Sequence, residues 1–150
     1  MTIEINSSID IRATKEEIFQ VVSDHEGTPN WVDEVKCIKL IKEGTPKNGK
    51  GAIREVHFKP LLWNTVQERI VHFEPNTEYQ YKVVKMPGLK DHLGTFYLED
   101  TATDLITLRW TVHMEFKKYH PFSLFANKFK RDFKIVQEKG FQKLKERLES

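Results

Sequence analysis

Arg54 and Glu68 are the two polar residues of this 150-residue chain whose spacing most clearly suggests a shared site. They lie in Ala52–Lys59 and Thr65–Glu74, segments that alternate apolar and polar residues as β-strands do. A turn centred on Leu61 would place Arg54 opposite Glu68 on the more apolar face of both strands. A guanidinium and a carboxylate in this register can form a charge-assisted pair. The pair could be structural, or it could orient a carbonyl, hydroxyl or carboxylate of a bound molecule.

His92 is the second candidate for chemistry, because an imidazole in an apolar pocket can act as a general acid or base. It has the same parity as Phe96 in its predicted strand. We expect a loop at residues 100–103 to place it opposite Trp110. The alternative is a histidine near solvent at the start of a strand. His72 could likewise line the interior or lie at its end.

Apolar side chains of the predicted strands and helices could form the walls of a binding site, although most such residues simply build a core. Trp63 differs, because it lies in an apolar turn where exposure to water is costly. We expect Trp63 to cover the mouth of a cavity; burial in the body of the domain is the alternative. The candidate wall residues are Trp31, Val56, Phe58, Trp63, Tyr79, Tyr81, Phe96, Trp110, Met114, Phe125 and Phe129.

Several other kinds of chemistry lack their sequence signals. Cys37 is the only cysteine, so the chain can form no internal disulfide. The sequence has no glycine-rich phosphate loop, no nucleophile elbow and no metal-ligand spacing. We therefore expect no cofactor, no metal and no covalent intermediate.

Composition limits the partners. The net charge of +2 gives no strong overall field, and we predict no nucleic-acid binding. No apolar run approaches the roughly 20 residues that span a bilayer, and the first residues lack a signal-peptide pattern, so we predict a soluble, cytoplasmic protein. Basic residues near the start of the last helix, among them Lys117 and Lys128, could make transient contact with a membrane surface or form an ordinary solvated face. Exposed strand edges would allow a dimer.

The predicted elements begin with a strand at Thr2–Arg12. A capping box of Thr14 and Glu17 then opens a helix that runs to about Asp24, and Pro29 starts a second short helical turn. Six strands follow, separated by short turns, and this spacing favours antiparallel hairpins. These strands are Val35–Lys42, Ala52–Lys59, Thr65–Glu74, Glu78–Lys85, Leu93–Glu99 and Leu105–Lys117.

A long amphipathic helix is predicted from about Pro121 to Glu149. Its apolar face consists of Phe122, Phe125, Phe129, Phe133, Val136, Gly140, Leu144 and Leu148. The last strand has one apolar face for this helix to cover. The residues of that face are Ile106, Leu108, Trp110, Val112, Met114 and Phe116.

This order of elements resembles the START-like (SRPBCC) superfamily, with the polyketide cyclase/dehydrase branch the most similar. Local matches are Ile9-Asp10-Ile11 before the first helix, Trp31-Val32 before the second strand, and the segments 68–70 and 94–98. The resemblance covers essentially the whole chain, so it implies one domain over residues 1–150. It implies an α+β helix-grip fold, in which a curved seven-stranded antiparallel sheet wraps around a long C-terminal helix. Two short helices lie between strands 1 and 2, and a cavity for apolar molecules lies between sheet and helix.

Fold alone does not decide function, because this superfamily includes enzymes, transport proteins and regulators. The first expectation is a carrier or sensor that binds a small hydrophobic ligand of lipid, polyketide or aromatic type. The second is a polyketide cyclase or aromatase in which Arg54, Glu68, a tyrosine or His92 assists proton transfer. The third is a protein-interaction module with a vestigial cavity.

Overall fold

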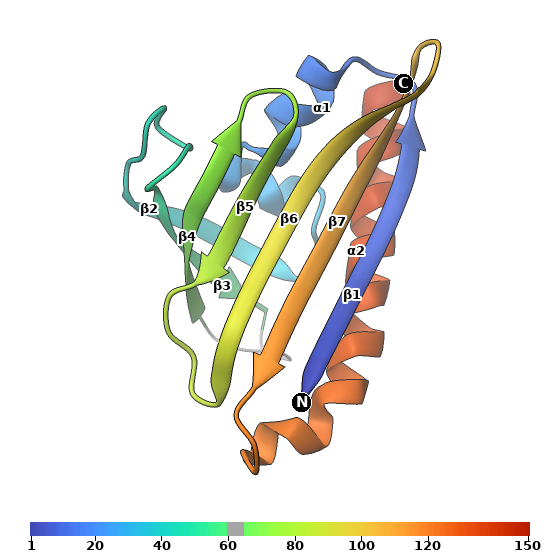
Figure 1. Cartoon of the computed structure of the whole chain (residues 1–150). Coiled ribbons are helices and arrows are strands. Elements are labelled where there is room, and N and C mark those ends of the chain that lie inside the picture. Colours follow the sequence, from blue (N-terminus) through green and yellow to red (C-terminus); the bar gives the residue numbers. More distant parts are fainter. Residues whose placement is uncertain (60–64) are drawn as a thin grey trace.

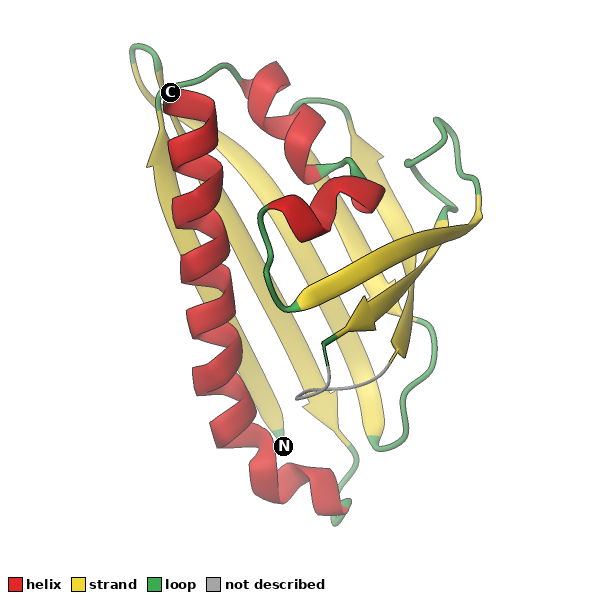
Figure 2. Cartoon of the chain, turned by 180° about the vertical axis from the view of Figure 1, so that it is seen from behind, coloured by secondary structure: helices red, strands yellow, loops and turns green. Residues whose placement is uncertain are grey.

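A curved antiparallel sheet and one long helix dominate the structure, a computed structural model that describes residues 1–59 and 65–150 (Figure 1). The seven strands follow the spatial order β1-β7-β6-β5-β4-β3-β2. Their bounds are β1 Thr2–Ile11, β2 Val35–Lys42, β3 Ile53–Phe58, β4 Thr65–Glu74, β5 Glu78–Val83, β6 Leu89–Ala102 and β7 Leu105–Phe116. The helix α2 (Ala126–Glu149) and the short helices lie on the same side of the sheet (Figure 2). This arrangement confirms the predicted helix-grip fold.

The hairpin of β6 and β7 forms the long central part of the sheet. All six apolar residues predicted for one face of β7 are buried, as the strict alternation of that strand requires. β6 is longer than the predicted Leu93–Glu99, because its polar ends also pair with β7 through the backbone. Backbone pairing of this kind leaves no signal in the hydropathy pattern.

Two short helices connect β1 to β2. In α1 (Lys15–Val22) the side chain of Thr14 accepts a hydrogen bond from the backbone N–H of Glu17 at 3.1 Å, so the predicted helix cap is confirmed. The next helix, η1 (His25–Asn30), begins before Pro29 rather than at it. It follows α1 almost directly, since the N–H of Gly27 bonds to the carbonyl of Asp24.

The C-terminal segment divides into two parts where the sequence predicted a single helix. A 3₁₀ turn, η2 (Pro121–Phe125), precedes α2. Successive residues rotate by a larger angle in a 3₁₀ turn than in an α-helix, so Phe125 leaves the inward face and is 60% exposed. The prediction that Phe125 lines the cavity is therefore wrong.

Buried polar contacts hold α2 against the sheet. The hydroxyl of Ser7 donates to Gln137 Oε1 at 2.8 Å, and Gln137 Nε2 donates to the carbonyl of Trp110 at 3.2 Å. Gln137 thereby joins α2 to both β1 and β7. Apolar residues of α2 such as Phe141 and Leu144 are buried in the same core, and burial of each such side chain contributes about 1.5–3 kcal/mol.

Candidate functional site

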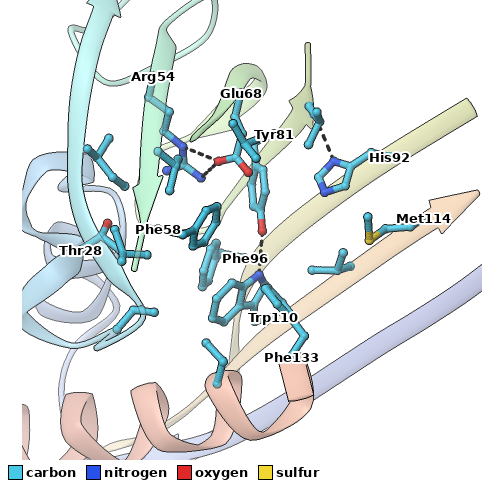
Figure 3. Close-up of a pocket in the computed structure, with 18 of the residues that line it drawn as sticks. Thr28, Arg54, Phe58, Glu68, Tyr81, His92, Phe96, Trp110, Met114 and Phe133 are labelled. Carbon is cyan, nitrogen blue, oxygen red and sulfur yellow. Dashed lines mark hydrogen bonds and ion pairs between the residues drawn. The ribbon is translucent and has the colours of Figure 1, made fainter. Parts of the chain in front are cut away.

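A cavity of about 90 Å³ lies between the concave face of the sheet and α2 (Figure 3). Most of the residues predicted from the sequence line it. Trp63 lies outside the described residues, and Phe125 is absent from the lining. The predicted residues found in the lining are Trp31, Arg54, Val56, Phe58, Glu68, Tyr79, Tyr81, His92, Phe96, Trp110, Met114 and Phe129.

Other lining residues were not singled out from the sequence. They come from η1, the strands β2, β4, β5 and β7, the connections that precede β2 and β6, and α2, and several simply continue the alternation or helical period that identified their neighbours. They are Thr28, Val32, Val35, Ile38, Val66, Val83, Met86, Val112, Phe133 and Val136.

Arg54 and Glu68 form an ion pair in the cavity wall. They are direct partners in the β3–β4 register, as the sequence predicted. Arg54 Nε and Nη2 donate to the same carboxylate oxygen, Glu68 Oε1, at 2.9 and 2.8 Å. The residues are only 6% and 8% exposed, so water screens the pair weakly. The other oxygen, Glu68 Oε2, has no hydrogen-bond partner among the described residues.

His25 completes this polar cluster, and sequence reasoning missed it. Its Nδ1 accepts a hydrogen bond from Arg54 Nη1 at 2.8 Å, and its Nε2 donates to the carbonyl of Asn48 at 2.9 Å. These partners require the neutral imidazole. Complete burial, and then the positive charge of Arg54, lower the pKa of His25 to about 3. No local pattern revealed it, because His25 lies in the connection that the sheet closes over.

The charge of Arg54 is stable in this setting. Burial tends to lower its pKa, but Glu68 together with Tyr79 and Tyr81 raises the pKa of Arg54 above its usual value. The guanidinium carbon lies 4.8 Å from the ring centroid of Tyr81 and 6.0 Å from that of Tyr79, which are cation–π distances. The two rings therefore help to hold the cation in place.

Tyr79 and Tyr81 use their hydroxyls differently. The hydroxyl of Tyr79 donates to the carbonyl of Val22 at 2.8 Å, which ties β5 to α1. The hydroxyl of Tyr81 accepts a hydrogen bond from the indole N–H of Trp110 at 2.9 Å. The proton of the Tyr81 hydroxyl has no acceptor among the described residues. Burial and the charge of Glu68 raise the pKa of Tyr81, so this hydroxyl stays protonated. It is a hydrogen-bond donor in the cavity wall.

His92 lies opposite Met114 rather than Trp110, and Phe96 is the residue that pairs with Trp110. The predicted register was wrong because β6 continues to Ala102, with an irregularity near the turn. His92 is buried, at 7% exposed, so the alternative of a solvent-exposed histidine is wrong as well. Its Nδ1 accepts the backbone N–H of Val83 at 3.2 Å, and burial lowers its pKa. The ring is therefore neutral, with its proton on Nε2.

His72 does not line the cavity. An irregularity in the β4–β5 pairing between Ile70 and His72 reverses the alternation of β4. The side chain of His72 is 45% exposed and lies 3.6 Å from Glu78. Phe73 points inward instead, and its ring packs against Tyr79.

The remaining wall is aromatic. Phe96 and Trp110 are stacked with ring centroids 4.7 Å apart, and the ring of Trp31 lies edge-on to both. Figure 3 shows Phe96, Trp110 and Phe133 grouped at the α2 end of the cavity, with Arg54 and Glu68 at the other end. The cavity thus has an apolar end and a polar end joined by Tyr81.

Two features are absent from the described residues: a cluster of metal-ligating side chains and a helix that could cross a membrane. Within the described part of the chain, no three histidine, cysteine or acidic side chains lie together as a metal site. No helix in the described segments is both long and apolar enough to cross a bilayer.

Comparison with known proteins agrees with this architecture. The sequence model of the family described as "polyketide cyclase / dehydrase and lipid transport" matches residues 2–149. Among curated proteins, none matches this sequence significantly.

Similar solved structures share the fold at low sequence identity. A START superfamily protein from Mycobacterium smegmatis has a TM-score of 0.75 and 16% identity, with 97% of each chain covered. A protein from Thermus thermophilus has a TM-score of 0.76 and 14% identity, again with 97% of each chain covered. Ara h 8.0201 has a TM-score of 0.74 and 16% identity, covering 99% of this chain and 98% of its own.

Identities this low establish the fold alone, whereas the family match extends over nearly the whole sequence. The chain therefore belongs to the polyketide cyclase/dehydrase and lipid transport family.

Proposed function

We propose that this protein binds a small, mainly apolar molecule that carries a hydrogen-bonding group, and that it serves as a carrier or sensor of that molecule. One observation carries the proposal. The aromatic cavity ends at a polar cluster in which Glu68 Oε2 and the hydroxyl proton of Tyr81 have no partner among the described residues. Polar groups that face an apolar cavity are the groups that a ligand's own polar atom can bind, so these two atoms are where we expect a ligand to be anchored.

The two groups define the chemistry of that partner. Tyr81 donates and Glu68 Oε2 accepts, so a ligand hydroxyl can bind both, and a carbonyl can bind Tyr81. The ring faces of Phe96 and Trp110 suit the apolar body of such a ligand. These are the contacts that a binding site needs: apolar walls and a few placed polar groups.

The cavity volume limits the size of the ligand. An engineered cavity of about 150 Å³ is sufficient for benzene. The present cavity of about 90 Å³ is smaller than that benchmark, so it suits a slender alkyl chain unless the walls move apart. This small volume argues against a rigid multi-ring ligand in the conformation seen here.

Mass spectrometry of molecules extracted from the purified protein tests the proposal. We expect the wild type to carry an apolar molecule that a variant with a filled cavity, Val112→Phe, loses. Val66→Phe fills the same cavity from β4 instead of β7. Loss of the molecule in both variants therefore cannot result from a folding defect in one strand. Circular dichroism and the unfolding midpoint report whether each variant is folded. Equal recovery from wild type and folded variants would place the molecule elsewhere and refute the proposal.

A second function, catalysis of a cyclase or dehydratase type, rests on the neutral state of His92. Its ring centroid lies 5.6 Å from that of Tyr81, so two neutral donors, the Nε2–H of His92 and the hydroxyl of Tyr81, adjoin in the same wall and could polarise a ligand carbonyl. Conversion of a bound ligand by the wild type but not by His92→Gln would favour this function. Recovery of the bound molecule unchanged would favour the carrier or sensor.

A further inference from the structure

The pairing of β5 with β6 does not reach the N-terminal end of β6. The last paired residues are Tyr81 and Gly94, whereas β6 begins at Leu89. The connection from β5 swings away from β6 before it returns (Figure 1). Across this divergence the N–H of Val83 bonds to the imidazole of His92 in place of a backbone carbonyl. At this point a side chain, rather than a backbone carbonyl, links the two strands.

A surface hollow of about 360 Å³ occupies this divergence, and we name it the β5–β6 window. Val83, Met86 and His92 line both the window and the cavity, so the two hollows adjoin at these residues. The residues that line the window are Lys82, Val83, Val84, Lys85, Met86, Pro87, Leu89, Lys90, Asp91, His92 and Lys117.

The window is strongly basic. Four lysines and one aspartate line it, and His92 is neutral. Lys82 lies 3.6 Å from Asp91, and Lys90 lies 3.3 Å from Glu115. Lys85 and Lys117 are exposed and have no ion-pair partner within residues 1–59 and 65–150. Two cations are therefore available to an anion from solution.

We propose that the β5–β6 window binds the anionic group, a carboxylate or a phosphate, of an amphipathic ligand whose apolar part occupies the cavity. This inference rests on the proposed function, because it assigns a position to the charged end of the same ligand. The apolar part passes the side chains of Val83, Met86 and His92, and the anion meets Lys85 and Lys117. The cavity contributes the apolar contacts, and the window distinguishes an anion from a neutral analogue.

Calorimetric titration of the full chain with three probes tests the inference. The probes are 1-octanol, octanoate and octyl phosphate, which share an alkyl chain and differ in the head group. At low salt and pH 7.5 we expect both anions to bind more tightly than octanol. The double variant Lys85→Gln/Lys117→Gln reduces that preference by about fivefold, as expected for the loss of two exposed ionic contacts. The charge-matched control Lys36→Gln/Lys50→Gln, which changes exposed lysines outside the window, leaves the preference unaltered.

The outcomes separate this inference from the proposed function. A preference for only one of the two anions identifies that head group and supports the window. The window proposal is overturned if the anions bind no more tightly than octanol, or if their preference survives in the Lys85/Lys117 variant. In both cases the cavity proposal stands. Lysine-dependent binding of octyl phosphate without any octanol binding supports the window and contradicts the cavity proposal.

Discussion

The indole N–H of Trp110 donates a hydrogen bond of 2.9 Å to the hydroxyl of Tyr81, across the strand β6 that separates them. This bond fixes the hydroxyl oxygen as an acceptor and leaves its proton for another partner. It also joins the aromatic end of the cavity to the ion pair of Arg54 and Glu68, since the guanidinium lies over the ring of Tyr81. The properties of the site therefore depend strongly on Tyr81.

Removal of the Tyr81 hydroxyl should cost stability without removing the ring. Tyr81→Phe leaves the indole N–H of Trp110 buried and unpaired, and we expect the free energy of unfolding to fall by about 1–3 kcal/mol. Urea denaturation measures this change. Tyr97→Phe is the matched control, because Tyr97 lies on the exposed face of β6 and its loss of a hydroxyl should have little effect. Equal effects in the two variants would contradict the role given to the bond.

Neutralising Glu68 should destabilise the fold strongly. Glu68→Gln leaves the buried guanidinium of Arg54 without its counter-charge, and breaking a buried pair in this way costs about 3–5 kcal/mol. The same change in the exposed pair of Arg109 and Glu99, Glu99→Gln, should cost less than about 1 kcal/mol. Chemical denaturation of both variants provides the comparison. A small effect at Glu68 would mean that water reaches the pair.

A side chain at position 94 should displace the ring of Tyr81. A Cβ added to Gly94 would lie 2.1 Å from Tyr81 Cζ, and the buried ring has little room to move. We expect Gly94→Ala to lower the free energy of unfolding by about 1–3 kcal/mol. Gly27→Ala is the control, since the atoms nearest to its Cβ belong to the exposed carboxylate of Asp24, which can rotate away. Thermal unfolding distinguishes them, and equal melting temperatures would show that the ring adapts.

Stability should fall in mild acid because of His25. The pKa of His25 is about 3 in the folded protein and 6.5 as its ordinary value, so the unfolded chain binds a proton first. The stability that neutral His25 contributes to the fold is complete above pH 6.5 and decreases as the pH falls toward 3. The loss from pH 7 to pH 5 is about 2 kcal/mol. His92, whose pKa is also lowered, adds a loss of the same sign.

Urea midpoints of wild type and His25→Gln across this range measure the effect of His25. The variant should show the weaker dependence on pH. The pKa of His113 is raised by its hydrogen bond to Glu4, so its contribution has the opposite sign, but it is common to both proteins. Parallel curves for the two proteins would show that His25 does not titrate as described.

The sequence was informative where periodicity reports burial. The alternation in β7 identified the buried face that includes Trp110 and Met114, and the spacing around a short connection placed Arg54 opposite Glu68. Both inferences need only the period of a strand and a regular antiparallel register.

Irregularities limited what the sequence could predict. The irregularity at Ile70–His72 reversed the alternation of β4, because a single extra residue changes the face of every residue after it, and so moved His72 outward. His92 kept its predicted face, but β6 continues to Ala102, so the later turn placed it opposite Met114 instead of Trp110. His25 was missed for a different reason. Its partners Arg54 and Asn48 are distant in sequence, and only tertiary packing brings them together.

The most direct test of the account is a titration with 1-octanol followed by ¹H–¹⁵N spectra of the tryptophan indole groups. Trp31 and Trp110 line the cavity, and the indole of Trp110 is bonded to Tyr81. A ligand in the cavity should shift both indole resonances saturably, while the backbone amide of the exposed residue Ile41, which is not in the lining, stays in place. Indole resonances that remain unchanged while surface amides shift would contradict binding in the cavity.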